Sequence, residues 1–297
     1  MQVVKNRFIY FGISLVLIIV GFASMIYNAS KGHGAFNYDI QFTGGTSIQV
    51  EFDKEVSNDE MSEIFKEIAG EEPAQIQELE GNVKLIKTKS LSPEMRSDIQ
   101  QKIIESYEVE EADFIIQDVS GTISAEMKRT AILSVVLACI AMLIYLAFRF
   151  KDLLIALSIV IALLQDALVV LASYALLRIP LNNNFIAVML TVLGYSINAS
   201  IVIFDRVREN RRIIGRNNFE ELVDVSVRQT VTRSLFTSAT TFFTIFCLYL
   251  FGVDAVKQFA LPISVGIVAG TYSSIFISGN AWYVAVTKSK ARANNKK

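Results

Sequence analysis

The chain has 297 residues, of which 52% are hydrophobic and only 19% are charged, whereas about a quarter of the residues in a typical soluble domain are charged. The formal net charge of −1 conceals an uneven distribution. Acidic residues predominate between Lys31 and Gly121, and the segments between the later apolar runs are mostly basic. This pattern is typical of a polytopic membrane protein with one water-exposed domain, and no nucleic-acid partner is expected.

Residues suited to catalysis or metal binding are scarce. Cys139 and Cys247 both fall within apolar runs, where they are expected to act as small hydrophobic residues, and His33 is the only histidine. No disulfide framework, phosphate loop, metal-ligand spacing or pairing of a nucleophile with a base is evident. The sequence therefore predicts neither an enzyme nor a cofactor.

The first apolar run, Phe8–Tyr27, is about 20 residues long and can cross a bilayer core. Lys5 and Arg7 precede it, as basic residues precede the core of a signal peptide. The run is longer than such a core, and no small-residue cleavage site follows it. We therefore expect an uncleaved first membrane helix.

A water-exposed segment with a βαββαβ pattern follows, from about residue 28 to 121. Thr46–Phe52 alternates apolar and polar residues as a half-buried strand does. Ser57 with Glu60 forms a capping box, and Ser92-Pro93 begins a second helix. The remaining strands are expected near 74–79, 83–88 and 114–119. This order predicts a small ferredoxin-like domain whose acidic excess is a solvated surface, with a partner-gripping role as the alternative.

Five further apolar runs follow, so six membrane helices are expected in all. The runs cover about 132–148, 153–177, 185–204, 235–251 and 259–286. Basic residues concentrate near both chain termini and after the second and fourth helices, so the positive-inside rule predicts cytoplasmic termini. The expected fold is a polytopic α-helical membrane protein with a small α+β ferredoxin-like extracytoplasmic domain between helices 1 and 2. Residues 1–29 would hold the cytoplasmic N-terminus and helix 1, residues 30–125 the domain, and residues 126–297 helices 2–6 with their loops and basic tail.

The connection between the fourth and fifth helices has its own pattern. Phe219, Leu222, Val223 and Val227 lie on one helical face of the segment 218–227. This predicts a short amphipathic cytoplasmic helix. A passive connector on the membrane surface is the preferred interpretation, and a docking helix is the alternative.

Three polar residues inside the membrane runs are candidates for ion coupling. Asp166 lies near the middle of the third run, Asn198 lies in the fourth, and Arg233 lies where the fifth begins. A carboxylate at the bilayer centre costs about 3 kcal/mol, so Asp166 should face the bundle interior or a water-filled cavity. It would handle protons or ions, or act as a structural hydrogen-bonding acid. Arg233 would anchor at the interface or form the counter-charge to an acid in the bundle.

Small residues mark the expected packing faces. Gly266, Gly270, Ser274 and Ser278 recur every four residues in the last run, as in a close helix–helix contact. Gly194 lies four residues before Asn198 and places a small-residue notch on the side of the amide.

Several motifs, in order, resemble the SecF family of membrane proteins. Gly44-Gly45-Thr46 opens the domain as the Gly-Gly-Thr signature of the family does, and the segment 119–126 resembles its lead into the second helix. The strongest match is Gly194–Asn198 followed by Asp205-Arg206 and the rest of the charged run to Asn210. Gln229-Thr230, Arg233 and 237–241 resemble the start of the fifth helix.

The resemblance implies a subunit of the Sec protein translocase in the bacterial cytoplasmic membrane. Its partners would be SecD, the SecY channel complex, the translocating polypeptide and the lipid bilayer. Such subunits, which resemble resistance-nodulation-division transporters, are thought to use a proton or sodium gradient to help exported chains across the membrane. In the family pattern an aspartate of the ion path follows the fourth-helix asparagine, and here that position is Ala199.

Ala199 leaves three hypotheses. The chain is a SecF-type export subunit whose coupling rests on Asp166, on SecD or on both. Alternatively, it is a SecF-like scaffold without its own ion path. A third possibility is a resistance-nodulation-division exporter of lipids or small molecules, for which the domain of roughly 90 residues is small.

Overall fold

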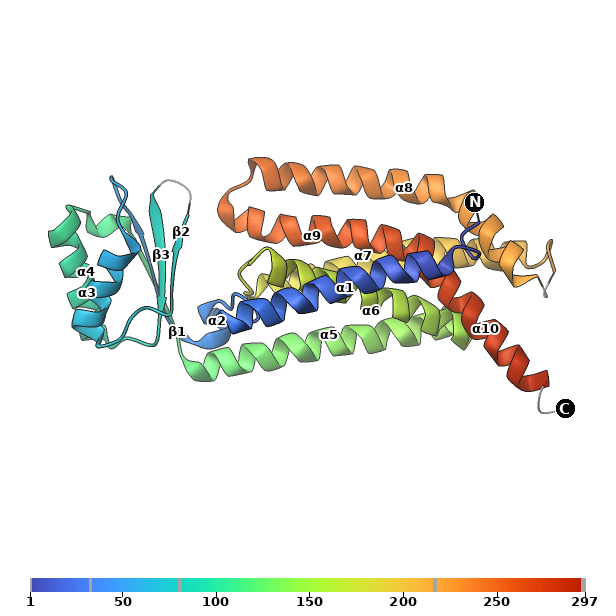
Figure 1. The fold of residues 1–297 in the computed structure, drawn as a ribbon, viewed down its shortest axis with the longest axis horizontal. Helices are drawn as coiled ribbons and strands as arrows, with labels where there is room; N and C mark the ends of the chain where they lie inside the picture. Colours follow the sequence, from blue (N-terminus) through green and yellow to red (C-terminus); the bar gives the residue numbers. More distant parts are fainter. Residues whose placement is uncertain (1, 32–33, 80–81, 216–217, 295–297) are drawn as a thin grey trace. The chain divides into compact units, whose positions relative to one another are not determined.

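The computed structural model describes residues 2–31, 34–79, 82–215 and 218–294 (Figure 1). His33 and residues 80–81 of the expected strand connection lie outside these ranges. The chain divides into two compact units, Met1–Asn37 with Ile132–Lys297, and Tyr38–Ala131. The first is a helical bundle and the second contains the sheet.

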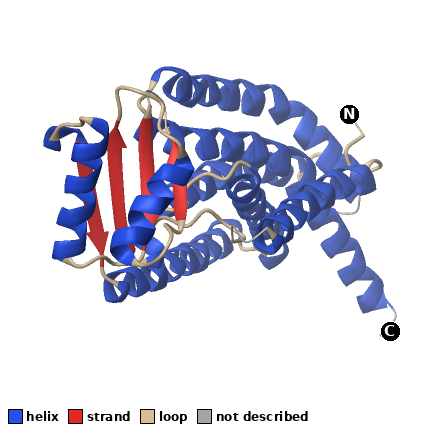
Figure 2. Cartoon of the chain, turned by 60° about the vertical axis from the view of Figure 1, so that its left-hand side comes forward, coloured by secondary structure: helices blue, strands red, loops and turns tan. Residues whose placement is uncertain are grey.

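The smaller unit has the predicted βαββαβ order. Its four strands form one antiparallel sheet in the order β2-β3-β1-β4, which is the ferredoxin-like arrangement (Figure 2). Two short elements, α2 (Ile40–Thr43) and the 3₁₀ helix η1 (Glu111–Asp113), were not expected from the sequence. The main elements are β1 (Gly45–Glu51), α3 (Asn58–Ala69), β2 (Gln75–Glu78), β3 (Val83–Thr88), α4 (Pro93–Tyr107) and β4 (Phe114–Val119).

One face of this sheet is covered by the two longer helices. Ile48 of β1 lies opposite Ile86 of β3 and Ile116 of β4 in the register of the sheet. These side chains belong to the same apolar cluster as Phe65 of α3 and Ile99 of α4. The apolar residues that recur every second position in the strands and every three to four positions in the helices therefore pack together in one small core.

Among the described residues, six helices are long and apolar enough to cross a membrane, and apart from the first residues of α5 they belong to the larger unit. The predicted number of helices is therefore confirmed. Five of them are α1 (Arg7–Ser30), α5 (Gly121–Phe150), α6 (Leu153–Leu176), α7 (Asn184–Asn210) and α8 (Phe219–Phe251). The sixth runs from α9 (Asp254–Ser273) through a π-helical segment, η2 (Ser274–Ser278), into α10 (Gly279–Asn294).

The six helices differ strongly in burial within the chain. In the most apolar 18-residue stretch of each helix, 50% of the residues of α6 and 67% of those of the last helix are buried. In α1, α5 and α8 the buried share is 11%. The helices α6, α7 and α9 therefore form the inner layer of the bundle. Large parts of α1, α5 and α8 are left to lipid or to a partner.

The segment 218–227 does not form the separate surface helix predicted from its pattern. It forms the first turns of α8, which continues without a break to Phe251. No glycine or proline interrupts residues 219–251, so nothing in the chain ends the helix. The predicted apolar face is buried within the chain, where Phe219 meets Trp282 edge to face and Val223 lies against Gly279. This face is therefore part of the bundle rather than a membrane-surface connector.

Candidate functional site

Asp166 lies at a point where three helices meet. It is fully buried in the middle of α6. Its Oδ2 accepts hydrogen bonds from the hydroxyl of Ser196 in α7 at 2.5 Å and from the hydroxyl of Ser273 in α9 at 2.7 Å. Its Oδ1 is equally buried and has no hydrogen-bond partner among the described residues. The carboxyl group therefore faces the bundle interior, as the sequence predicts, and keeps one oxygen available for a proton or an ion.

Two glycines of α9 allow α7 to approach this site. A Cβ atom on Gly270 would lie 2.9 Å from Cβ and 3.2 Å from Oγ of Ser196. A Cβ atom on Gly266 would lie 2.2 Å from a methyl group of Val192. Side chains at these positions would separate the helices, so the four-residue glycine spacing brings Ser196 within reach of Asp166.

The rest of the small-residue stripe enters the π-helical segment directly after Ser273. Ser274 and Ser278 are fully buried and donate hydrogen bonds to carbonyl oxygens of their own helix, those of Thr271 and Ser274. Single π-helical turns are uncommon within α-helices, but those that occur often lie at functional sites. The π-helical segment begins directly after Ser273, which donates a hydrogen bond to Asp166.

A second polar site lies on another face of α7. Tyr195, Asn198, Ala199 and Val202 of α7 and Arg233, Ser234, Thr237 and Ser238 of α8 line a pocket of about 70 Å³. Asn198 and Arg233, two of the three predicted ion-coupling residues, therefore share one pocket. Because successive helix residues are about 100° apart, Asn198 projects nearly opposite to Ser196, which faces Asp166.

Asp166 and Arg233 are not paired in this chain. Each contributes to a different site, and α7 carries residues of both sites on separate faces. Within the described ranges no carboxylate lies within ion-pair distance of the Arg233 guanidinium. Arg233 therefore forms no ion pair with an acid of the described residues, and its role as a counter-charge stays a prediction.

The hydroxyl-rich run after Arg233 bonds to its own helix. Thr237 donates a hydrogen bond to the carbonyl oxygen of Arg233, Thr241 to that of Thr237, and Thr244 to that of Thr240. The hydroxyls of Thr241 and Thr244 are therefore used within α8, whereas Thr237 also lines the pocket between α7 and α8.

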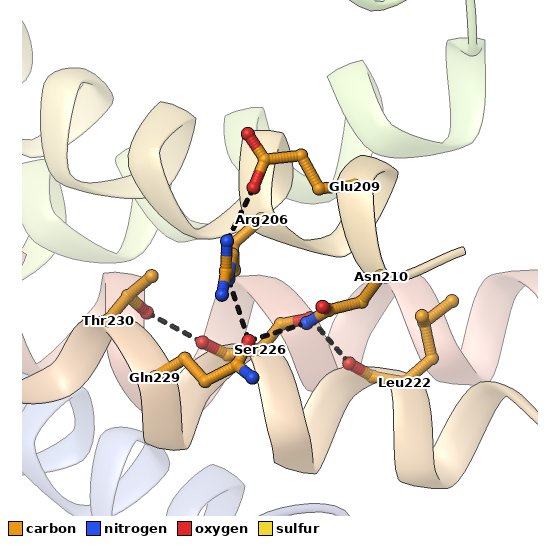
Figure 3. Close-up of polar contacts among 7 residues, drawn as sticks. All are labelled: Arg206, Glu209, Asn210, Leu222, Ser226, Gln229 and Thr230. Carbon is orange, nitrogen blue, oxygen red and sulfur yellow. Dashed lines mark hydrogen bonds and ion pairs between the residues drawn. The ribbon is translucent and has the colours of Figure 1, made fainter. Parts of the chain in front are cut away.

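Charged residues at the end of α7 hold neighbouring helices together. Asp205 forms an ion pair with Arg149 of α5 at 2.9 Å and lies 3.6 Å from Arg208 of its own helix. Arg206 donates to Oε1 of Gln229 in α8 at 2.7 Å and pairs with Glu209 at 2.7 Å (Figure 3). The predicted motif residues Asp205 and Arg206 thus connect α7 to α5 and α8.

Asn210, the last residue of the motif that includes Asp205 and Arg206, completes this network, a role that the sequence analysis did not assign to it. Its buried amide nitrogen donates to the hydroxyl of Ser226 at 2.9 Å and to Oε1 of Gln229 at 2.8 Å (Figure 3). Ser226 and Thr230 lie four residues apart on the buried side of α8. In the sequence, the only indication of this network was that Ser226 and Thr230 lie beside the apolar residues of the 218–227 segment.

The N-terminal segment is fixed at the same end of the bundle. The backbone N–H groups of Val3 and Val4 donate to Oδ1 of Asp224 at 2.8 and 3.0 Å, and both valines are fully buried. Asp224 lies outside the apolar face of the 218–227 segment. The segment before α1 is therefore part of the folded bundle.

The Gly44-Gly45 motif has a steric reason. Gly45 has φ +124°, and a Cβ atom there would lie 2.2 Å from the carbonyl oxygen of Thr88. Gly44 has φ +73°, a region that non-glycine residues seldom adopt. The next residue, Thr46, donates its hydroxyl to Asp118 at 2.8 Å and accepts from the N–H of Leu91 at 3.0 Å. The motif therefore lets β1 enter the sheet beside β3.

Replacing Gly45 with alanine is expected to destabilise the smaller unit by at least about 1–3 kcal/mol, because the backbone must move to relieve both the clash and the positive φ. Hydrogen exchange of the β1 and β3 amides in the full chain would measure this loss. Gly121→Ala is the matched control, because a Cβ atom at Gly121 meets nothing within 4 Å. Equal protection in the two variants would contradict the steric argument.

The remaining predicted position, Gly194, differs from the other membrane glycines. A Cβ atom there meets nothing within 4 Å inside this chain. Gly194 therefore makes no close helix contact within the bundle. The described residues also contain no group of three or more histidine, cysteine, aspartate or glutamate side chains that could hold a metal ion.

A bundle of six membrane-spanning helices around a buried carboxylate, with a ferredoxin-like unit after the first helix, defines a class of polytopic membrane proteins with an ionisable intramembrane centre. Comparisons with known proteins narrow this class. Residues 82–288 match the family model described as protein export membrane protein SecD/SecF, C-terminal. The chain belongs to the SecD/SecF family of protein export membrane proteins, and within it to the SecF subunits of the protein translocase.

Individual relatives agree along nearly the whole chain. The protein translocase subunit SecF of Sebaldella termitidis is 35% identical over 292 residues, which cover 96% of this chain and 91% of the relative. The subunit SecF of Escherichia coli O157:H7 is 33% identical over 273 residues, which cover 90% and 82%.

Two solved structures of SecDF share the fold. The crystal structure of SecDF from Thermus thermophilus, described as a translocon-associated membrane protein, matches with a TM-score of 0.84 and 31% identity over 97% of this chain. A SecDF structure in a super-membrane-facing form matches with a TM-score of 0.69 and 29% identity over 100% of this chain. The chain spans 39% and 40% of these two longer chains.

Proposed function

We propose that this chain works with SecD to assist the export of unfolded polypeptides through the SecY channel of the bacterial cytoplasmic membrane, and that it uses the transmembrane ion gradient. The single observation that carries the ion-coupling part is the buried Asp166, with Oδ2 held by two hydroxyls and Oδ1 unpartnered. Intramembrane acids are costly and commonly mark proton or ion pathways. Loading and unloading of Asp166 would change the contacts among α6, α7 and α9.

The proposed membrane orientation is supported by where the basic segments meet. Arg149 after α5 pairs with Asp205 near the end of α7, and Arg211 lies 3.8 Å from Asp152 at the start of α6. These contacts support placing the basic segments at one end of the bundle, which the positive-inside rule assigns to the cytoplasm. Residues 30–125 would then form an extracytoplasmic domain that acts on emerging polypeptides, between the first helix in 1–29 and the five helices of 126–297.

The scaffold alternative has one observation in its favour. Ala199 lines the pocket beside Asn198 and Arg233 and has no group that can bind a proton. A subunit without its own ion path would still connect SecD to the channel. A small-molecule or lipid exporter of the resistance-nodulation-division type is less well supported, because the curated relatives above are protein translocase subunits.

Purification of the chain from its membrane, followed by export assays, tests the proposal. SecD and the SecY channel complex are expected to co-purify with it, and depletion of the chain should slow export of a secreted reporter only while the ion gradient is intact. Slowing of equal size after the gradient is collapsed would support the scaffold. Absence of SecD from the purified material would overturn the proposal.

A further inference from the structure

An apolar groove runs along α9, with α8 on one side and α1 and α6 on the other. One hollow of about 350 Å³ lies between α8 and α9 and reaches Leu235 and Phe276. A second hollow of about 490 Å³ continues from it and is lined in part by Leu17 of α1. The two hollows share Phe242, Val268 and Tyr272. No charged residue is among those that line them, so the groove presents an apolar surface inside the membrane.

The dimensions of the first hollow fit an acyl chain better than a helix. The hollow follows α9 and the π-helical segment from Ile267 to Phe276 for about 13 Å, so its mean cross-section is about 26 Å². A helix with its side chains is at least about 10 Å wide, which corresponds to about 80 Å². Together the two hollows follow this helix from Leu261 to Phe276 for about 22 Å, against about 15 Å for one leaflet of the hydrocarbon core. An acyl chain, a single file of methylene groups, can therefore lie along the groove over its whole length.

The N-terminal segment crosses the bundle at the end of the groove near Phe276. The backbone N–H of Val3 donates to Asp224 of α8 at 2.8 Å, and its carbonyl oxygen accepts from Asn280 of α10 at 3.4 Å. Tyr10 of α1 stacks on Phe276 with the ring centroids 4.4 Å apart. The segment therefore connects the start of α8 to the start of α1 beside this end of the groove (Figure 1).

Two basic residues of this crossing segment lie on the α1 side. Lys5 is exposed, and Arg7 is the first residue of α1. The guanidinium of Arg7 lies over the ring of Tyr283 in α10, 5.5 Å from its centroid. Tyr283 follows Phe276 by two helical turns and is therefore on the same side of the helix. Arg7 thus lies about 10 Å beyond the apolar lining, where the hydrocarbon core gives way to headgroups.

A third basic residue, Arg228, lies on the α8 side. It is exposed, one turn after Asp224 and two turns before Leu235, so it shares the side of α8 that borders the groove. Within the described ranges Arg228 forms no ion pair. Asp224, the acid one turn away, already accepts two backbone N–H groups. Positive charge therefore flanks the end of the groove on both sides.

We propose that the groove holds an acyl chain of an anionic phospholipid whose phosphate group binds Lys5, Arg7 and Arg228. The basic residues favour an anionic headgroup, and the apolar walls accept the chain. A phospholipid carries both parts in one molecule and places them in this order along a membrane helix. The site depends on neither the export function nor the orientation proposed above, because binding is measured on the purified chain alone.

Native mass spectrometry of the purified full chain in detergent tests the headgroup, with phosphatidylglycerol and phosphatidylcholine of the same acyl chains as probes. One phosphatidylglycerol is expected to bind at least about fivefold more tightly than phosphatidylcholine. Arg228→Gln should weaken phosphatidylglycerol binding about fivefold, since a basic residue near the membrane surface contributes about this much, and should leave phosphatidylcholine binding unchanged. Arg212→Gln is the matched control, because Arg212 is equally exposed in the turn after α7 and its loss changes the net charge equally.

Val268→Phe tests the acyl-chain part of the site. Val268 is 57% exposed and lines both hollows, so the added ring should fill the groove and lower the binding of both lipids. Val136→Phe is the matched control, because Val136 is 47% exposed on α5 and lines neither hollow. Gel filtration shows whether each variant remains folded. In the wild type, phosphatidylglycerol with a photoreactive diazirine in its acyl chain should label Phe242, Val268 or Tyr272.

Three outcomes would overturn the proposal. The first is equal binding of the two lipids, or full phosphatidylglycerol binding in Arg228→Gln. The second is acyl-chain labelling that is confined to helices other than α1, α6, α8 and α9. The third is a wild-type chain that purifies as a dimer and becomes monomeric in Val268→Phe with unchanged lipid binding, which would place a second copy of the chain in the groove.

Discussion

Asp166→Asn is expected to reduce gradient-dependent export to the level seen without a gradient. Asparagine has nearly the same shape, and its amide oxygen can still accept the hydroxyls of Ser196 and Ser273. It cannot ionise, so the site can no longer load and unload a proton or bind a cation through charge. The measurement is export of a secreted reporter in cells that depend on the variant, with and without an ionophore that collapses the gradient.

Serine variants give a graded control. Ser273→Ala removes one of the two hydroxyls that hold Asp166, and we expect an intermediate loss of the gradient-dependent part of export. Ser264→Ala also removes a buried hydroxyl from α9, but that hydroxyl bonds only to the carbonyl oxygen of Ala260 in its own helix, so export should be unchanged. If the Asp166→Asn variant kept the full gradient-dependent part of export, Asp166 would not be the ion-coupling residue. Coupling to the gradient would then have to be carried out by SecD.

Gly270→Ala is expected to lower the free energy of unfolding of the bundle by about 1–3 kcal/mol, the usual cost of overpacking a tight contact. The added Cβ would lie 2.9 Å from Cβ of Ser196, so α7 must shift away from α9. That shift would also lengthen the hydrogen bond from Ser196 to Asp166. Thermal unfolding can be followed through the fluorescence of Trp282, the only tryptophan, which is fully buried.

Gly12→Ala is the matched control for this substitution. Gly12 lies in α1, and a Cβ atom there meets nothing within 4 Å. The higher helix propensity of alanine should then stabilise the chain by up to about 1 kcal/mol. If Gly12→Ala and Gly270→Ala had equal stability, the close approach of α7 and α9 would not be what holds Ser196 at the site.

The βαββαβ unit was predictable because its periods and caps are local. Ser92 accepts a hydrogen bond from the N–H group of Met95 at the start of α4, as its position predicts. Ser57 caps α3 through the N–H group of Asp59, but the predicted capping box is wrong, because the Glu60 carboxylate accepts the hydroxyl of Tyr107 instead. The alternation around Ile48 likewise fixes which side of β1 faces the helices. The number of membrane helices was also predictable, since hydrophobic length alone marks a span.

The local sequence pattern did not predict contacts between residues that are far apart in the chain. The apolar face of 219–227 indicates an amphipathic helix, but it does not say whether that face meets lipid or Trp282. Asp224 likewise looks like a solvated charge until the N-terminal segment brings the N–H groups of Val3 and Val4 to it. Both outcomes involve contacts more than 60 residues apart in the sequence.

The amino-acid sequence by itself determined the six spans, the sheet-containing unit, the family and the presence of a carboxyl group inside the membrane. Only the tertiary structure decided that Asp166 lies with Ser196 and Ser273 while Arg233 shares a pocket with Asn198. The reason is that hydrophobicity states which residues leave water, whereas partners inside a bundle depend on helix rotation and approach. Those are set jointly by Gly266, Gly270 and the side chains that they meet.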